Sequence, residues 1–224
     1  MNTTPYEKLK TTLKNKLMGL GMVDPRYYTC VKALEFAEKI HDGYRKDGVT
    51  KEFYHQLSML GFAMSNHNSL TKPYRVYTCI ILHDTYEDFD KFKDKHPNLI
   101  EDLYFEFPDD IEFVVRISKI RYKKDGESYI KYGVNYDEYF GEMSECEVTS
   151  FSKGVDRFHN LSTMVGVFPK KKMEKYISEV DFYFLPMLKN ARKKFPEQDQ
   201  AYQMIKSVLN VQCTTVTKML EIIE

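Results

Sequence analysis

The chain has 224 residues, of which 42% are hydrophobic and 29% are charged, and this composition excludes an intrinsically disordered protein. Lys and Arg together number 33, as do Asp and Glu, so the formal net charge is zero. Proteins that bind nucleic acid through phosphate contacts are usually basic, so the charge argues against a nucleic-acid partner. We expect a single globular domain over residues 1–224, because no linker-like stretch divides the chain.

The sequence shows no membrane or export signal. No apolar run approaches the roughly 18–20 residues that a membrane-spanning helix needs, and the first residues carry scattered lysines without the apolar core of a signal peptide. The cysteines are far apart and lack metal-binding spacing, so we expect reduced thiols packed among apolar side chains. These features predict a cytoplasmic protein without membrane contact.

Most apolar residues recur with helical spacing, which predicts an all-α fold. In chain order, the apolar stripes predict helices around residues 31–40, 53–64, 73–81, 111–118, 148–158, 173–188 and, as an additional C-terminal helix, about 198–223. Segment 119–135 breaks this pattern because it is polar, rich in tyrosine and centred on Asp125-Gly126. It is expected to form a loop or a short β-hairpin.

Four polar positions interrupt the apolar stripes: His55, the pair His83-Asp84, the pair Glu87-Asp88, and Asp156. Taken singly, each is more often an ordinary surface or helix-end residue. Taken together, imidazole and carboxylate groups suit Mn, Fe or Zn. Two His and two Asp from three separate helices would form a mononuclear metal site with open positions for water and substrate.

The helix around Asp156 can be tested with a helical wheel. At about 100° per residue, Asn160 and Thr163 lie on the same face as Asp156, while the large apolar side chains lie on the opposite arc. The helix would therefore bury its apolar face and present these three polar residues together. A solvated polar face is the alternative interpretation.

Three stretches carry a resemblance to a known family. They are 33–55, with Ala33-Leu34-x-Phe36-Ala37, Tyr44-Arg45-Lys46-x-Gly48 and Tyr54-His55; Leu82-His83-Asp84-Thr85-x-Glu87-Asp88; and Lys153-x-x-Asp156-Arg157-x-His159-Asn160-x-x-Thr163-Met164. Their order and spacing resemble the HD-domain metal-dependent phosphohydrolases, and more narrowly the hydrolase domain of RelA/SpoT-type alarmone enzymes. The resemblance covers about residues 31–190 and implies an HD-domain helical bundle of the small alarmone hydrolase type.

The resemblance implies an enzyme that removes pyrophosphate from the 3′ position of (p)ppGpp, leaving GDP or GTP, as part of the stringent response. The cofactor would be Mn²⁺, with Fe²⁺, Co²⁺ or Zn²⁺ as alternatives. The metal ligands implied in this way are His55, His83, Asp84 and Asp156.

The resemblance also implies roles for residues around the metal. Glu87 and Asp88 would orient a water molecule or carry its proton. The implied substrate-binding residues are Arg45 against the guanine face, Lys46 at a phosphate, and Asn160 and Thr163 at the ribose or a nearby phosphate.

Three departures from the family pattern leave the substrate open. Gln56 stands where the family usually has Pro, Phe89 where Thr is common, and segment 119–147 has an unexpected composition and would form a lid or part of the pocket. The alternatives are a nucleotidase or (d)NTP phosphohydrolase of the wider HD superfamily, and a non-catalytic nucleotide-binding or antitoxin module. Two macromolecular partners stay open: a second copy of the chain, through the last helix, and a toxin that the protein would neutralise.

Other polar residues have plainer expected roles. Arg157 is expected to brace its helix through an ion pair, and His159 to pack beside the site and not to act as a fifth ligand. His41, His67 and His96 have no motif around them and are expected at the surface or in turns.

Overall fold

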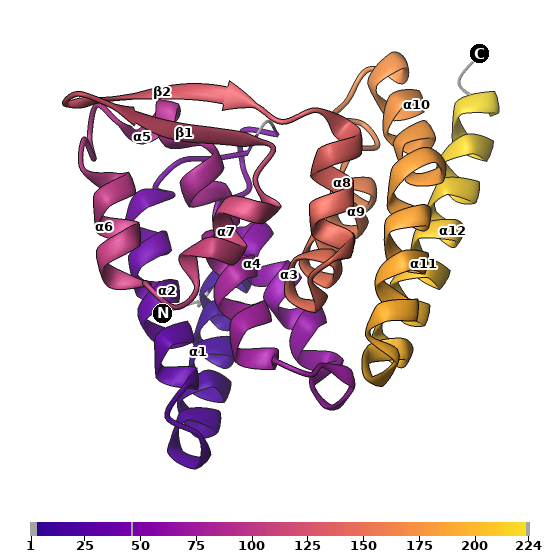
Figure 1. Cartoon of the computed structure of the whole chain (residues 1–224). Coiled ribbons are helices and arrows are strands. Elements are labelled where there is room, and N and C mark those ends of the chain that lie inside the picture. Colours follow the sequence, from indigo (N-terminus) through magenta and orange to yellow (C-terminus); the bar gives the residue numbers. More distant parts are fainter. Residues whose placement is uncertain (1–3, 46, 223–224) are drawn as a thin grey trace.

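The computed structural model describes residues 4–45 and 47–222, and these are mostly helical with one two-stranded antiparallel sheet (Figure 1). The predicted all-α fold with a short hairpin is therefore confirmed. The buried apolar side chains form one cluster that runs from the first helix to the last. No helix in the described part of the chain is both long enough and apolar enough to cross a membrane.

Helix α4 (Pro73–Glu87) occupies the middle of the bundle. Every residue from Val76 to His83 is buried, so this helix is enclosed on all sides and has no solvent face. It packs against α2 (Tyr27–Ile40), α3 (Tyr54–Ser65), α7 (Ile111–Ile117) and α9 (Glu147–Thr163). Pro73 starts it, where the fixed φ of proline suits the first helical turn. The last turn of α4 therefore ends inside the protein.

Several helices lie outside the stretches for which the apolar pattern predicted one. They are α1 (Pro5–Val23), the short α5 (Phe89–Phe92), α6 (Leu99–Glu106) and α8 (Tyr136–Ser144). Each buries only a short stripe; α1, for example, buries Leu13, Leu17 and Gly21. Local caps help to start two of them, because the side chains of Thr4 and Asn135 accept hydrogen bonds from the third residue of the helices that follow.

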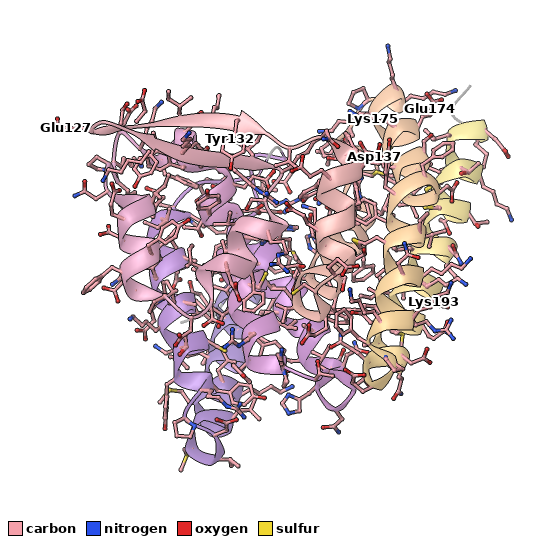
Figure 2. The ribbon with its side chains drawn as sticks, in the orientation of Figure 1. Glu127, Tyr132, Asp137, Glu174, Lys175 and Lys193 are labelled. Atoms are coloured by element: carbon pink, nitrogen blue, oxygen red, sulfur yellow. The ribbon has the colours of Figure 1, made fainter. Side chains whose placement is uncertain are left out.

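Strands β1 (Ile120–Asp125) and β2 (Ser128–Gly133) form the hairpin that crosses above α6 and α7 in Figure 1. Asp125 pairs with Ser128, which leaves a two-residue loop of Gly126 and Glu127. Gly126 has φ +60°, as the first central position of a type II′ turn requires. The tip of the hairpin, with Glu127, projects beyond the helices, and Tyr132 lies further back along β2 (Figure 2).

The C-terminal quarter of the chain is a helical layer packed on α8 and α9. Helix α10 (Lys170–Glu179) continues through a π-helical turn (Val180–Phe184) into α11 (Leu185–Lys194), and this continuous unit corresponds to the long helix predicted over 173–188. Helix α12 (Asp199–Ile222) is the predicted C-terminal helix. Two single 3₁₀ turns, His67–Ser69 and Pro196–Gln198, complete the elements of the described chain.

Helices α9 and α12 approach closely at Gly154. A Cβ atom at this position would lie 2.9 Å from Ile205 Cγ2 and 3.3 Å from Leu188 Cδ2. Glycine is therefore needed for contact here, and this contact sets the position of the middle of α9 relative to α11 and α12.

The four cysteines are buried and form no disulfide, as expected for reduced thiols.

Candidate metal centre

Three helices bring the predicted metal ligands together. His55 lies in the first turn of α3, His83 and Asp84 in the last turn of α4, and Asp156 in the middle of α9. One ligand atom from each of His55, His83 and Asp156 lies within 4.8 Å of the other two, and all three residues are buried. His55 Nε2 is 3.3 Å from Asp156 Oδ1.

Asp84 adjoins this compact group of three. Its Oδ1 lies 3.0 Å from His83 Nε2, and its Oδ2 lies 3.6 Å from His55 Nε2. The four residues that the sequence predicted as ligands are therefore neighbours in the structure, although they come from positions about 100 residues apart in the chain. Together they form the ligand cluster.

The residues of the ligand cluster fit a divalent cation. His83 Nδ1 donates to the carbonyl oxygen of Ile80 at 2.8 Å, so the lone pair of this imidazole is on Nε2. Nε2 is buried and accepts no hydrogen bond from any described residue. A buried ring nitrogen 3.0 Å from Asp84 Oδ1 and close to Asp156 needs a positive charge between itself and these carboxylates, which either a proton or a metal ion supplies. The mixed imidazole and carboxylate donors suit Mn, Fe, Co or Zn.

The charges of the ligand cluster favour a bound positive charge. Burial opposes protonation of His83, but the carboxylates of Asp84 and then Asp156 outweigh it and raise the pKa of His83 to about 9. Burial likewise opposes ionisation of Asp84, yet the neighbouring histidines hold its pKa well below the usual range. The cluster therefore attracts positive charge, and a divalent cation would take the place of the proton.

Asp156 is held as an anion by its own helix. Lys153 Nζ, one turn earlier, lies 2.9 Å from Asp156 Oδ2, and Asn160 Nδ2, one turn later, donates to Oδ1 at 2.6 Å. Burial alone would raise the pKa of Asp156, but Lys153 and the two histidines hold it well below its usual value. Lys153 is itself buried, and the same pairing raises its pKa.

His159 supports His55 from α9. The two Nδ1 atoms are 2.7 Å apart, so one must donate and the other accept. Burial, with the charges of His55 and Arg45, lowers the pKa of His159 to about 3, so this ring is neutral. If His55 donates from Nδ1, its Nε2 is left as a ligand atom facing Asp156. The expected supporting position of His159 is thus observed.

Gln56, which replaces the usual proline, also contacts the cluster. Its Nε2 donates to Asp84 Oδ2 at 3.1 Å, so the amide holds the carboxylate beside the two histidines. The sequence motif marks Gln56 only as a departure. Its contact depends on how α3 and α4 pack.

Two cavities meet at the ligand cluster, because Arg45, His55, Asp84 and Asp88 line both of them. The larger cavity has a volume of about 730 Å³ and extends toward α8 and α10. The smaller cavity has a volume of about 370 Å³ and lies under the loop between α2 and α3, next to the end of α9.

Glu87 and Asp88 lie where α4 ends. Both line the larger cavity, and Asp88 also lines the smaller one. Glu87 is half-buried and Asp88 is exposed by surface area. Desolvation within the cavities raises the pKa of each carboxyl; at Glu87 Lys153 opposes this rise, and at both the Asp84 carboxylate adds to it. Each can therefore hold a proton at a higher pH than an ordinary surface carboxyl, which suits a group that passes protons to or from a reactant.

The predicted substrate-binding residues are divided between the cavities. Thr163 lines the smaller cavity, where its hydroxyl lies 3.4 Å from an Arg45 guanidinium nitrogen. Asn160 lines the larger cavity and is bonded to Asp156. The predicted common face of α9 is therefore divided: Asp156 and Asn160 line the larger cavity, and Thr163 lines the smaller one. Lys46 lies outside the described residues.

Segment 119–147 forms one wall of the larger cavity, through Lys119, Tyr136, Tyr139 and Phe140. Next to this wall, Glu179 of α10 accepts hydrogen bonds from Tyr136 Oη at 2.6 Å and from an Arg157 nitrogen at 2.6 Å. The expected ion pair of Arg157 is thus present, and it joins α9 to α10.

One histidine contradicts its expected position. His41 is buried and its Nε2 lies 3.0 Å from the hydroxyl of Thr85, in the turn of α4 that carries Asp84. Sequence analysis also gave no role to Lys153 or Glu179. The spacing of Lys153 three residues before Asp156 was a usable signal for an ion pair, whereas no local pattern links Glu179 to the site.

Comparison with known proteins found no matching family model and no matching curated protein. A functional assignment therefore depends on the site geometry and on the sequence motifs.

Proposed function

We propose that this protein is a metal-dependent phosphohydrolase that removes the 3′-pyrophosphate of (p)ppGpp, yielding GDP or GTP and pyrophosphate. The observation that carries the proposal is the unsatisfied, buried Nε2 of His83, which faces Asp84 within a cluster that also holds His55 and Asp156. The position of this cluster between two cavities, one of them rich in lysine, supports a phosphorylated substrate.

His55, His83, Asp84 and Asp156 would hold the cation. A bound Mn²⁺, or a similar ion, would polarise a phosphoryl oxygen and lower the pKa of a water molecule. Lys153 and Asn160 keep Asp156 ionised and oriented, and Gln56 and His159 do the same for Asp84 and His55.

The protein's carboxyl groups would move the protons. The water oxygen adds to the phosphorus next to the ribose, the bond from this phosphorus to the 3′ oxygen breaks, and the 3′ oxygen takes up a proton. Glu87 and Asp88 line the cavity where this exchange would occur, and their raised pKa values allow one carboxyl to accept the water proton while the other supplies one.

Arg45 would orient the nucleoside. Its guanidinium lies at the junction of the two cavities, and the smaller one also carries Tyr44, Tyr54 and Phe168. A planar guanidinium stacks on a purine face, and aromatic rings offer further apolar contact. The choice of guanine comes from the family resemblance.

The runner-up is a nucleotidase or (d)NTP phosphohydrolase of the wider HD superfamily. It is favoured by segment 119–147, whose composition departs from the family pattern and whose lysine and aromatic side chains line the larger cavity. A non-catalytic binding or antitoxin module is less favoured, because all four ligand residues and both carboxyls are retained and lie together.

Product analysis tests the proposal. Purified protein is incubated with Mn²⁺ and, separately, with ppGpp, pppGpp, ppApp, dNTPs and nucleoside monophosphates. We expect GDP and pyrophosphate from ppGpp, and no product with Asp84→Ala. Asp102→Ala is the matched control, because Asp102 is exposed on α6 and does not line either cavity. Cleavage of other nucleotides alone would favour the runner-up, and no cleavage with metal bound would refute hydrolysis.

A further inference from the structure

The larger cavity has two ends of opposite charge. Next to the ligand cluster it is acidic, with Asp84, Glu87 and Asp88. Away from the cluster it is lined by lysines: Lys119 precedes the hairpin, and α10 contributes the others. Figure 2 shows Lys175 near the upper end of α10, well separated from Lys193 on α11.

Two other cations of this cavity are already neutralised. Lys153 is paired with Asp156, and Arg157 is paired with Glu179 at 2.6 Å. Glu179 thus serves Arg157 and also Tyr136, and it lies 3.8 Å from Lys175 Nζ. Among the described lining residues, Glu179 is the only carboxylate contributed by α10 or by segment 119–147, so positive charge is in excess at this end.

Lys119 contributes to this excess of positive charge in the larger cavity. Its Nζ lies 3.5 Å from the centroid of the Tyr136 ring, on the side of the cavity formed by segment 119–147. Its electrostatic neighbours include Lys175 and Lys153 as well as Glu179 and Glu87. Lys119 therefore lies between the carboxyls at the ligand cluster and the lysines of α10.

Several ammonium groups that line the same cavity as the ligand cluster are suited to a chain of phosphoryl groups. Lysine binds phosphate as a compact point charge, and several lysines can follow successive phosphates. The smaller cavity, by contrast, is lined by one lysine among the described residues, Lys91, together with the carboxylates of Asp47 and Glu52, and it has about half the volume. A nucleotide whose scissile phosphorus lies at the ligand cluster can therefore place its base on one side and its terminal phosphates on the other.

We propose that the α10 end of the larger cavity is a pyrophosphate-binding site, formed by Lys119, Lys171 and Lys175. It would hold the pyrophosphoryl end of a substrate before cleavage and free inorganic pyrophosphate afterwards. The placement of the substrate in this orientation rests on the proposed function. The binding of free pyrophosphate rests on the cavity alone.

The affinity of the full chain for inorganic pyrophosphate tests this site. Calorimetry with the protein alone, and again with one equivalent of Mn²⁺, gives the dissociation constant. We expect Lys119→Gln to weaken binding about fivefold and the more exposed Lys175→Gln about threefold, because each removes one charge-assisted contact. Lys175→Arg retains the charge and should bind within about twofold of the unchanged protein.

Lys193→Gln is the matched control, since Lys193 carries the same charge on α11 and does not line this cavity. Thermal melting curves check that each variant is folded. A second measurement needs no variant: pyrophosphate should slow acetylation of Lys119 and Lys175 but not of Lys193, as read by mass spectrometry. Equal weakening in all three Gln variants, equal protection of all three lysines, or no binding under either metal condition would overturn the site.

The two proposals fail separately. If pyrophosphate binds through Lys119 and Lys175 but no nucleotide is cleaved, the proposed function is wrong and the site stands. If ppGpp is cleaved while Lys119→Gln and Lys175→Gln bind pyrophosphate like Lys193→Gln, the hydrolase stands and the site is wrong.

Discussion

The two cavities that meet at the ligand cluster are built in different ways. The smaller one depends on a loop that organises itself: Asp47 Oδ1 accepts from the backbone nitrogens of Val49 and Thr50, and Arg45 N donates to the carbonyl of Thr50. The left-handed φ of +73° at Gly48 completes this tight loop. Its conformation is thus set within about ten residues of sequence.

The larger cavity has walls that are held by long-range contacts. Glu179 of α10 joins Tyr136 of α8, which is 43 residues earlier, and Arg157 of α9, which is 22 residues earlier. Tyr122 of β1 donates to the carbonyl of Glu87, so the hairpin is tied to the end of α4. This comparison shows that motif residues can be placed locally on one side of a site, while the other side requires the whole fold.

The largest expected effect comes from changing the ligand cluster, where the two cavities meet. Asp156→Asn should remove a metal ligand and leave Lys153 buried without its partner charge. We expect at least a thousandfold loss of turnover and about 3 kcal/mol less free energy of unfolding. Turnover assays, Mn²⁺ calorimetry and urea unfolding measure these effects. Asp102→Asn is the control, and Mn²⁺ affinity unchanged in Asp156→Asn would contradict the assignment of Asp156 as a ligand.

The next prediction distinguishes the roles of the two cavities in binding. Arg45→Ala should raise KM for ppGpp about tenfold, which corresponds to about 1.4 kcal/mol, and leave the affinity for free pyrophosphate unchanged. Lys175→Gln should lower both affinities. Steady-state kinetics and pyrophosphate calorimetry on the same preparations check this. The two cavities do not have different roles if Arg45→Ala and Lys175→Gln change the KM for ppGpp and the affinity for pyrophosphate in the same proportion.

A packing change tests whether the approach of α9 and α12 holds the long-range wall. Gly154→Ala places a methyl group 2.9 Å from Ile205 Cγ2, so we expect the free energy of unfolding to fall by about 1–3 kcal/mol. Gly141→Ala in α8 is the matched control, because a Cβ there meets nothing within 4 Å, and it should be neutral or slightly stabilising. Urea unfolding gives both values. Equal unfolding midpoints for the two variants would show that α12 moves away from the new methyl group without loss of stability.

The smallest effect concerns a buried carboxyl outside the site. Unlike Asp156, Asp110 has an oxygen with no hydrogen-bond partner among the described residues, and burial raises its pKa to about 6. The unfolded value is lower, so the folded state binds more protons between about pH 4 and pH 6, and stability falls as the pH rises through this window.

Asp110→Asn should therefore stabilise the protein by about 1 kcal/mol at pH 7 and have little effect near pH 4. Unfolding curves at the two pH values measure the difference. The exposed Asp109→Asn, at the neighbouring position, is the control. A gain that is the same at both pH values would contradict the role of ionisation.

Much of the fold could be predicted because apolar spacing reports which face of a helix is buried. The continuous apolar run before His83 marks α4, and its burial on all sides follows from the same run. The turn at Gly126 was also encoded locally. Helix α1 and helix α8 were not predicted, because their short apolar stripes gain stability from packing and from caps more than from their own pattern.

The ligand cluster was predicted from motifs, since His55, His83, Asp84 and Asp156 stand at helix positions with recognisable neighbours. His41 shows the limit of that approach, because no neighbouring residue in the sequence indicates that Thr85 is its hydrogen-bond partner. Gln56 shows the same limit, because its bond to Asp84 exists only once α3 is packed on α4.

By itself, the sequence determined the helical class, a turn at Asp125-Gly126 and the identity of the four residues of the ligand cluster. Only the tertiary structure decided that Lys119, Glu179 and Lys175 face one cavity, and that His83 Nε2 is buried without a hydrogen bond. The physical reason is the distance along the chain over which each kind of interaction acts. Helix periodicity, caps and turns depend on neighbours a few residues away, whereas desolvation and charge pairing depend on every element that folds against a residue.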